Sequence, residues 1–132
     1  MLKLSEAMRK GIECSEPTTG IFIALGNNGT CEACALGAAL LGYAQCDVKT
    51  LLEESYIRLK ESPSSIASYG SAKNMLKEYG VDLNKLVKQP IPSWYDKESY
   101  PLDAIGGMVV MLNDQAAWTR EQIADWLESI GY

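Results

Sequence analysis

The sequence predicts a mainly α-helical fold, a compact single domain over residues 1–132 with about six or seven short helices and one small β-hairpin near residues 20–33. Two patterns predict it. Most segments repeat apolar residues every three or four positions, as one face of a helix requires. Residues 20–25 instead hold β-branched or aromatic residues at Ile21, Phe22 and Ile23, and the run is too short for a helix. With 132 residues, 47% of them hydrophobic, the chain can bury one core.

The first third combines a helix with the hairpin. Leu4, Met8 and Ile12 recur four residues apart, which predicts a short helix over residues 4–12, with Ser5 as a cap candidate. Residues 20–25 are predicted to form a strand. The Gly-Asn-Asn-Gly sequence that follows favours a turn, so that the chain runs back as a second brief strand over residues 30–33.

The next segments are predicted helices of two kinds. Residues 34–41 are almost entirely Ala, Leu and Gly, and a helix that is apolar all round is a buried one, ending here at Gly42. Residues 46–60 are amphipathic and follow Asp47, a favourable N-cap. Ser62 as a cap and Pro63 at the first helical position predict another helix.

The second half alternates helices with an extended connection. Residues 81–87 are predicted to add one or two helical turns after Asp82. Residues 88–101 hold three prolines, which lack the backbone donor, so an extended surface segment is expected. Pro101 then opens a helix that ends before a turn at residues 113–117. Thr119 caps the last helix, with Gln122 as its reciprocal partner.

Histidine is absent from the sequence, and this restricts the chemistry most. The commonest general acid-base at neutral pH is missing, and Ser-His or Cys-His nucleophiles cannot be built within one chain. Zinc or iron sites that use histidine are equally ruled out. No catalytic constellation is visible in the sequence, so we favour a protein that is not an enzyme.

The charge and hydropathy of the sequence limit the classes of partner that the protein could bind. The net charge is −5, from 12 basic and 17 acidic residues, and the basic residues are scattered, so nucleic acid is a disfavoured partner. The sequence Arg-Glu-Gln-Ile-Ala in the last helix resembles part of a helix-turn-helix. A DNA-binding accessory protein therefore remains an alternative, and in it Arg120 would be the cation that reaches the bases. No apolar run is long enough to span a membrane, and the N-terminus is charged, so a cytoplasmic location is predicted.

Two segments carry a resemblance. "CALGAAL" at residues 34–40 and "LNDQAAWTREQIADWLESIG" at residues 112–131 resemble a group of small bacterial and phage-associated proteins, as does the opening "KLSEAMRKGIE". The resemblance covers about a third of the chain. That group brings no established activity, so no catalytic residue is carried over from it.

The four cysteines allow three interpretations. Cys14, Cys31, Cys34 and Cys46 could together hold a structural zinc ion, although a second CxxC pair is lacking. Cys31 and Cys34 could form a thiol redox site at a helix start. We favour the third interpretation, in which the cysteines are small buried hydrophobic residues and no cofactor is bound.

The sequence therefore predicts a small protein that acts by binding, either to another protein or to a second copy of itself, in a role such as a phage-derived accessory factor. Trp94 and Tyr95 lie on the proline-rich segment, and aromatic residues that stay exposed there would suit a partner interface. The competing class is a cysteine-centred protein, with zinc or redox chemistry.

Overall fold

The computed structural model describes residues 1–90 and 102–132. The described residues form six helices and six short strands: α1 (Leu4–Glu13), β1 (Glu16–Pro17), β2 (Ile23–Leu25), β3 (Cys31–Ala33), α2 (Ala35–Tyr43), α3 (Val48–Leu59), β4 (Ser65–Ile66), α4 (Tyr69–Glu78), β5 (Leu86–Lys88), β6 (Leu102–Ala104), α5 (Ile105–Asp114) and α6 (Arg120–Ser129). The strands build two sheets, one of four strands and one of two. The fold is therefore mixed α/β, and the predicted mainly α fold with one hairpin is wrong.

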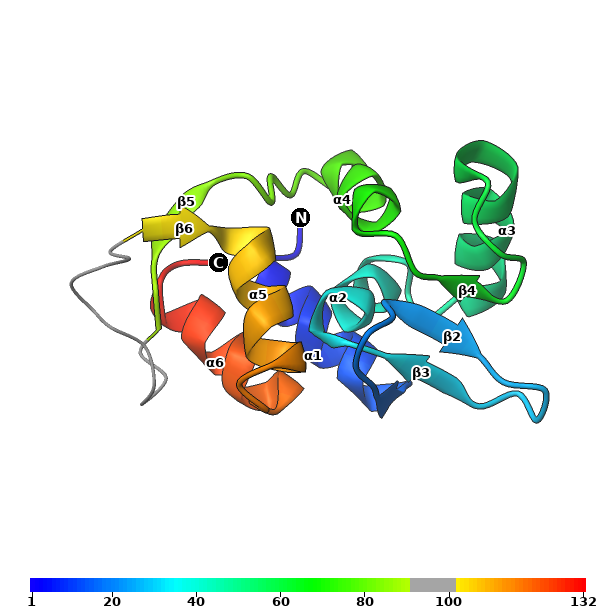
Figure 1. The fold of residues 1–132 in the computed structure, drawn as a ribbon, viewed down its shortest axis with the longest axis horizontal. Helices are drawn as coiled ribbons and strands as arrows, with labels where there is room; N and C mark the ends of the chain where they lie inside the picture. The colour runs from blue at the N-terminus through cyan, green and yellow to red at the C-terminus, as the bar shows by residue number, and fades with distance from the viewer. Residues whose placement is uncertain (91–101) are drawn as a thin grey trace.

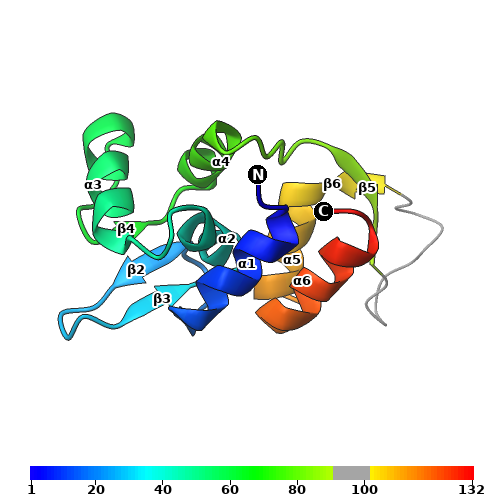
Figure 2. The same cartoon turned by 180° about the vertical axis from the view of Figure 1, so that it is seen from behind.

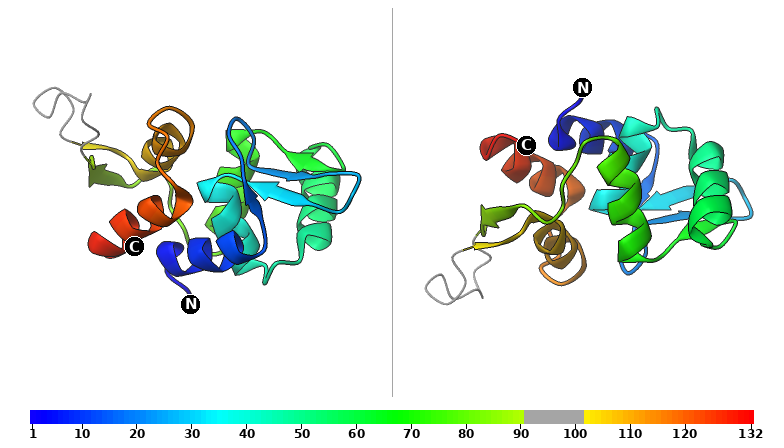
Figure 3. Two further views of the ribbon diagram at one scale, coloured as in Figure 1. Left: turned by 90° about the horizontal axis from the view of Figure 1, so that it is seen from below. Right: turned by 90° about the horizontal axis from the view of Figure 1, so that it is seen from above.

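The larger sheet grows outward from the predicted hairpin, whose strands are β2 and β3. Its order is β1-β3-β2-β4, with β1 parallel to β3 and the other pairs antiparallel. The smaller sheet pairs β5 with β6. In Figure 1 the larger sheet and α3 lie toward one end of the molecule and the β5–β6 pair lies at the other. Both views of Figure 3 agree with this arrangement.

Helix α2 lies at the centre, as its composition predicts. Every residue from Ala35 to Gly42 is buried, although the helix continues one residue past Gly42. Helix α1 packs beside it, as Figure 2 shows. A Cβ placed on Gly11 of α1 would lie 1.6 Å from the backbone oxygen of Ala38, so the two helices approach as closely as backbones can. The surrounding buried side chains form one hydrophobic cluster.

The helix predicted to start at Pro63 and to end at Gly80 forms as α4, but it starts six residues later, at Tyr69. The chain is extended at β4 instead, because the N–H of Phe22 donates to the Ile66 oxygen at 2.9 Å and that of Leu25 donates to the Ser64 oxygen at 2.8 Å. Pairing with the sheet therefore overrides the local helix signal. Helix α4 begins at Tyr69, where the Ser68 hydroxyl caps it.

Two further boundaries differ in the second half. The turns predicted over residues 81–87 give way to strand β5, and the helix expected to open at Pro101 starts at Ile105, after β6. Helix α5 starts at Ile105 because its first N–H groups have partners there. The Ile105 N–H donates to the Lys85 oxygen and the Gly106 N–H donates to the Leu83 oxygen, both at 2.9 Å. Most of the predicted extended segment, residues 91–101, lies outside the described residues.

Two predicted helix starts are confirmed. The Asp47 carboxylate accepts a hydrogen bond from the Thr50 N–H at the start of α3, at 3.2 Å. At α6, Thr119 accepts from the Gln122 N–H while Gln122 accepts from the Thr119 N–H, which completes the predicted reciprocal cap. Ser5, by contrast, is not the cap of α1; the helix starts after Lys3. No helix in the described parts of the chain is long and apolar enough to cross a membrane.

Candidate functional site

Asn113 joins three segments at the N-terminus of α2. Its side chain is only 7% exposed, so its polar atoms need partners inside the protein. The Oδ1 atom accepts from the Ala35 N–H at 3.0 Å, and the Nδ2 group donates to the Thr18 oxygen at 3.1 Å and to Asp114 at 2.7 Å. Asn113 thereby fixes the loop before β2 against the start of the central helix.

Arg120, in the first turn of α6, joins that helix to the segment after α1 and to strand β3. The residue is 6% exposed. The guanidinium donates to the hydroxyl and backbone oxygens of Ser15, at 2.7 and 2.9 Å, and to the Ala33 oxygen at 3.2 Å. Burial lowers its pKa, yet an arginine stays charged at neutral pH. The DNA-binding alternative needed Arg120 to reach bases, and the structure instead buries it as a link between helix and sheet.

Two segments that are distant in sequence therefore meet, residues 31–35 and residues 113–120. Asn113 and Arg120 belong to the closing segment, and both contact the segment that leads into α2. The two stretches are about 70 residues apart in sequence and adjacent in space. This junction is the candidate functional site.

A pocket of about 190 Å³ opens at the junction. Its walls come from the loop before β2, the start of α2, the residues after β4 and the end of α5, including Phe22, Cys34, Tyr69, Val109, Asn113 and Asp114. The walls are mainly apolar, and the amide of Asn113 and the carboxylate of Asp114 supply polar groups. Two other hollows, of about 580 and 610 Å³, are more open to solvent.

Cys34 lines this pocket but is a poor nucleophile. Only 5% of the residue is exposed, and burial raises the pKa of its thiol to about 11, against the opposing effect of the Gly37 and Leu36 N–H groups. At pH 7 on the order of one thiol in ten thousand would be ionised. The neighbouring Cys31 is half-buried, and burial raises its pKa too. Neither thiol has the lowered pKa that a redox CxxC requires.

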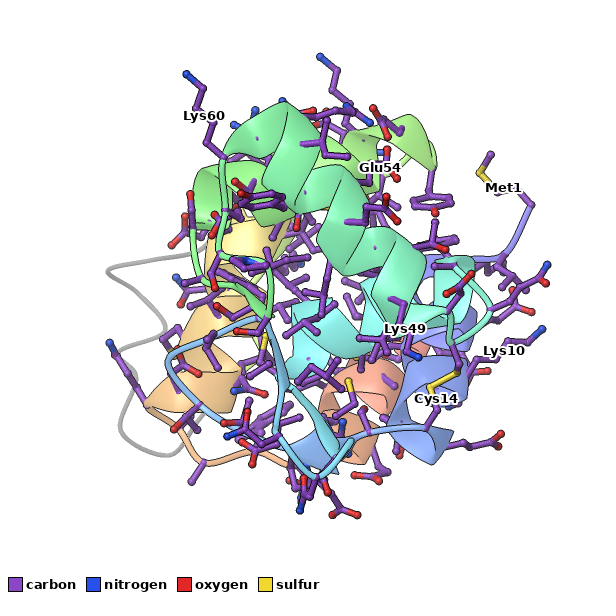
Figure 4. All side chains as sticks on the ribbon, turned by 90° about the vertical axis from the view of Figure 1, so that its right-hand side faces the viewer. Met1, Lys10, Cys14, Lys49, Glu54 and Lys60 are labelled. Atoms are coloured by element: carbon purple, nitrogen blue, oxygen red, sulfur yellow. A yellow bond between two sulfur atoms is a disulfide. The ribbon has the colours of Figure 1, made fainter. Side chains whose placement is uncertain are left out.

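The four cysteines do not come together. Cys14 and Cys46 form a disulfide, with Cα atoms 6.3 Å apart, while Cys31 and Cys34 are free thiols in and after β3. Figure 4 shows the disulfide beside Lys10. The predicted burial is confirmed for Cys34, while Cys31 is half-buried; the prediction of free, buried thiols is wrong for Cys14 and Cys46. Among the described residues, no group of three or more His, Cys, Asp or Glu side chains is placed to hold a metal ion.

The predicted partner residues cannot be placed, because Trp94 and Tyr95 lie outside the described residues. The sequence predicts Cys34 as the start of the buried helix, whereas it predicts only a turn at Asn113 and gives no sign of its bonds to Ala35 and Thr18. The sequence carries no local signal for this role, because the partners of Asn113 are distant along the chain.

Comparisons with known proteins find no matching family model, no matching curated protein and no matching solved structure.

Proposed function

We propose that this protein acts by binding another protein, and that one side chain of the partner enters the pocket between α2, α5 and the residues after β4. The observation that carries this proposal is the pocket itself, with apolar walls and two convergent polar side chains at the junction of residues 31–35 and residues 113–120. Such a combination is the usual form of a recognition pocket.

The size of the pocket favours a side chain over a free metabolite. Small-molecule pockets enclose about 300–1,000 Å³, well above the 190 Å³ found here. A cavity of about 150 Å³ suffices for benzene, so the pocket is large enough for one aliphatic or aromatic side chain. An anchor of this kind, held in a desolvated pocket, contributes much of the affinity in many protein interfaces.

The chemistry of the lining residues favours binding over catalysis. A cysteine nucleophile needs a low thiol pKa or a neighbouring base. The Cys34 thiol has a raised pKa, and histidine is absent from the sequence. Asn113 already uses its side chain to join the loop to α2. The described lining residues therefore supply recognition groups and no activated nucleophile.

The experiment is a selection from a random-peptide display library against three forms of the chain. Ala67 lines the pocket and is exposed, so Ala67→Phe fills the pocket without disturbing the core. Ile57→Phe on α3 adds the same ring at an exposed position outside the pocket lining and serves as the matched control.

Peptides selected on the wild-type chain should share one anchor residue, bind the Ile57→Phe chain equally, and bind the Ala67→Phe chain at least about tenfold more weakly. Peptides that bind all three chains equally, or a selection that enriches none, would contradict the proposal. Light scattering measures whether each chain self-associates. If the wild-type chain forms dimers and the Ala67→Phe chain does not, the partner is a second copy of this chain.

The cytoplasmic location stays a prediction, and the Cys14–Cys46 disulfide argues against it, since disulfides persist mainly in oxidising compartments.

A further inference from the structure

We propose that the side chain accepted by this pocket is a lysine, which lays its aliphatic stem along the apolar walls and brings its ammonium group to Asp114. The inference rests on the proposed function, because it names the anchor residue of the partner.

The charge of the pocket is the first argument. Among the lining residues that the structure describes, Asp114 is the one charged group, and none is a lysine or arginine. The Asp114 Oδ1 atom accepts from Asn113 at 2.7 Å and from the Gly20 N–H at 3.4 Å. Within the described parts of the chain, no basic group lies within 4.0 Å of this carboxylate. Asp114 therefore offers Oδ2 to a cation from outside.

The N-terminus of helix α2 has most of its N–H groups paired within the protein. A helix N-terminus attracts anions through N–H groups that lack partners. Here the Ala35 N–H donates to Asn113, the Gly37 N–H donates to the Cys34 sulfur at 3.4 Å, and the Ala38 N–H donates to the Cys34 oxygen at 2.8 Å. Asp114 also lies at the C-terminus of α5, where the helix dipole is negative and favours a cation.

The walls suit the stem of a lysine. Val109 and Leu36 provide aliphatic surface, and the rings of Phe22 and Tyr69, with centroids 6.2 Å apart, line the same pocket. Lysine side chains commonly bury the four methylene groups on such surface while the charged end remains near water. Aromatic faces add a favourable electrostatic interaction with the cation.

The hydrogen bonds of Asp114 favour lysine over arginine. A guanidinium group binds best when both oxygens of a carboxylate accept from it in parallel. Oδ1 already accepts from Asn113 and Gly20, and no residue among 1–90 and 102–132 donates to Oδ2, so Oδ2 is the oxygen offered to the partner. An ammonium group needs one acceptor and acts as a point charge, so it fits this carboxylate better.

The test uses three small probes with the full chain: the blocked amides of N-acetyl-lysine, N-acetyl-norleucine and N-acetyl-arginine. Chemical shifts of the Asn113 side-chain amide and the Gly20 N–H report binding, because both groups contact Asp114. Lysine should bind about tenfold more tightly than norleucine, and this preference should disappear in Asp114→Asn. Glu121→Gln, at an exposed carboxylate outside this pocket, should keep the preference.

The outcomes separate the two proposals. If norleucine binds as tightly as lysine, or arginine binds more tightly, the lysine inference is wrong while a side-chain pocket remains. If no probe shifts these resonances and the peptide selection also fails, both proposals are wrong. Asp114→Asn keeps the Oδ1 acceptor, so a folded variant is expected, and its amide spectrum checks this.

Discussion

Helices α1 and α2 meet backbone to backbone, whereas α3 is attached through a few side chains. A Cβ on Gly42 of α2 would lie 1.7 Å from the Ala7 oxygen of α1, so no side chain fits between the two helices there. Helix α3 buries Leu51, Leu52 and Ser55, and it exposes Ile57 to 67%. In Figure 3, α3 lies at the end of the molecule, away from α1 and α6.

The difference shows where stability and tolerance to substitution reside. Close-packed backbone cannot relax around an added atom, so a small change between α1 and α2 should cost much. Helix α3 is held by features that can be removed singly: its N-cap, the disulfide in the preceding loop and an arginine between two glutamates. Substitutions of different size in these two regions test this contrast.

The largest effect is expected for Gly42→Ala. The added Cβ would overlap the Ala7 oxygen, so the helices must separate, and we expect the free energy of unfolding to fall by about 4 kcal/mol or more. Urea unfolding followed by circular dichroism measures the loss. Gly107→Ala in α5 is the control, because nothing lies within 4 Å of that Cβ. It should leave stability unchanged or raise it by up to about 1 kcal/mol. Equal losses in both variants would contradict the close contact.

The second effect concerns the disulfide that ties the loop before α3 to the end of α1. Cys14 and Cys46 are 32 residues apart in sequence, and a loop of this length predicts a loss of about 3–4 kcal/mol for the Cys14→Ser/Cys46→Ser variant. Thermal unfolding with and without reductant gives the measurement. Reduced wild type should match the double variant, while Cys31→Ser, at a free thiol, should change little. A melting temperature that reductant leaves unaltered would argue against the disulfide.

The elements that could be predicted from the sequence are those whose signal is local. Helix α2 is apolar on every side, α6 carries a complete cap, and the Gly-Asn-Asn-Gly turn marks the β2–β3 hairpin. Strands β1 and β4 have two residues each, too few for a periodic pattern. They form because β3 and β2 offer backbone partners from distant positions, which is a tertiary effect.

The candidate site also contains residues that the sequence predicts and residues that it does not. Cys34 could be recognised as the start of α2 because the apolar run after it is continuous in sequence. Asn113 could not, because its partners at Ala35 and Thr18 are 78 and 95 residues away. The Cys14–Cys46 pairing likewise depends on α1 packing beside α2, and the spacing of the cysteines does not specify it.

The smallest effect is expected at the ion pairs of Arg58, which lies between Glu54 of α3 and Glu78 of α4. The hydrogen bond from Arg58 lowers the pKa of Glu78 below its ordinary value. A carboxylate with a lowered pKa stabilises the folded state above its unfolded pKa of about 4.3, and this contribution is lost as the pH falls through the folded value. Since the Glu78 side chain is 45% exposed, solvent screening should keep the contribution well under 1 kcal/mol.

Glu78→Gln should therefore lower stability slightly at pH 7 and flatten the decline in the acid range below the unfolded pKa of about 4.3. The measurement is urea unfolding across that range at low and high salt, where salt should shrink the difference from wild type. Glu53→Gln on α3 is the matched control, because no ion pair joins Glu53 to another described residue. If both variants follow the same acid profile, Arg58 does not couple α3 to α4, and the attachment of α3 depends on its three buried residues and the disulfide.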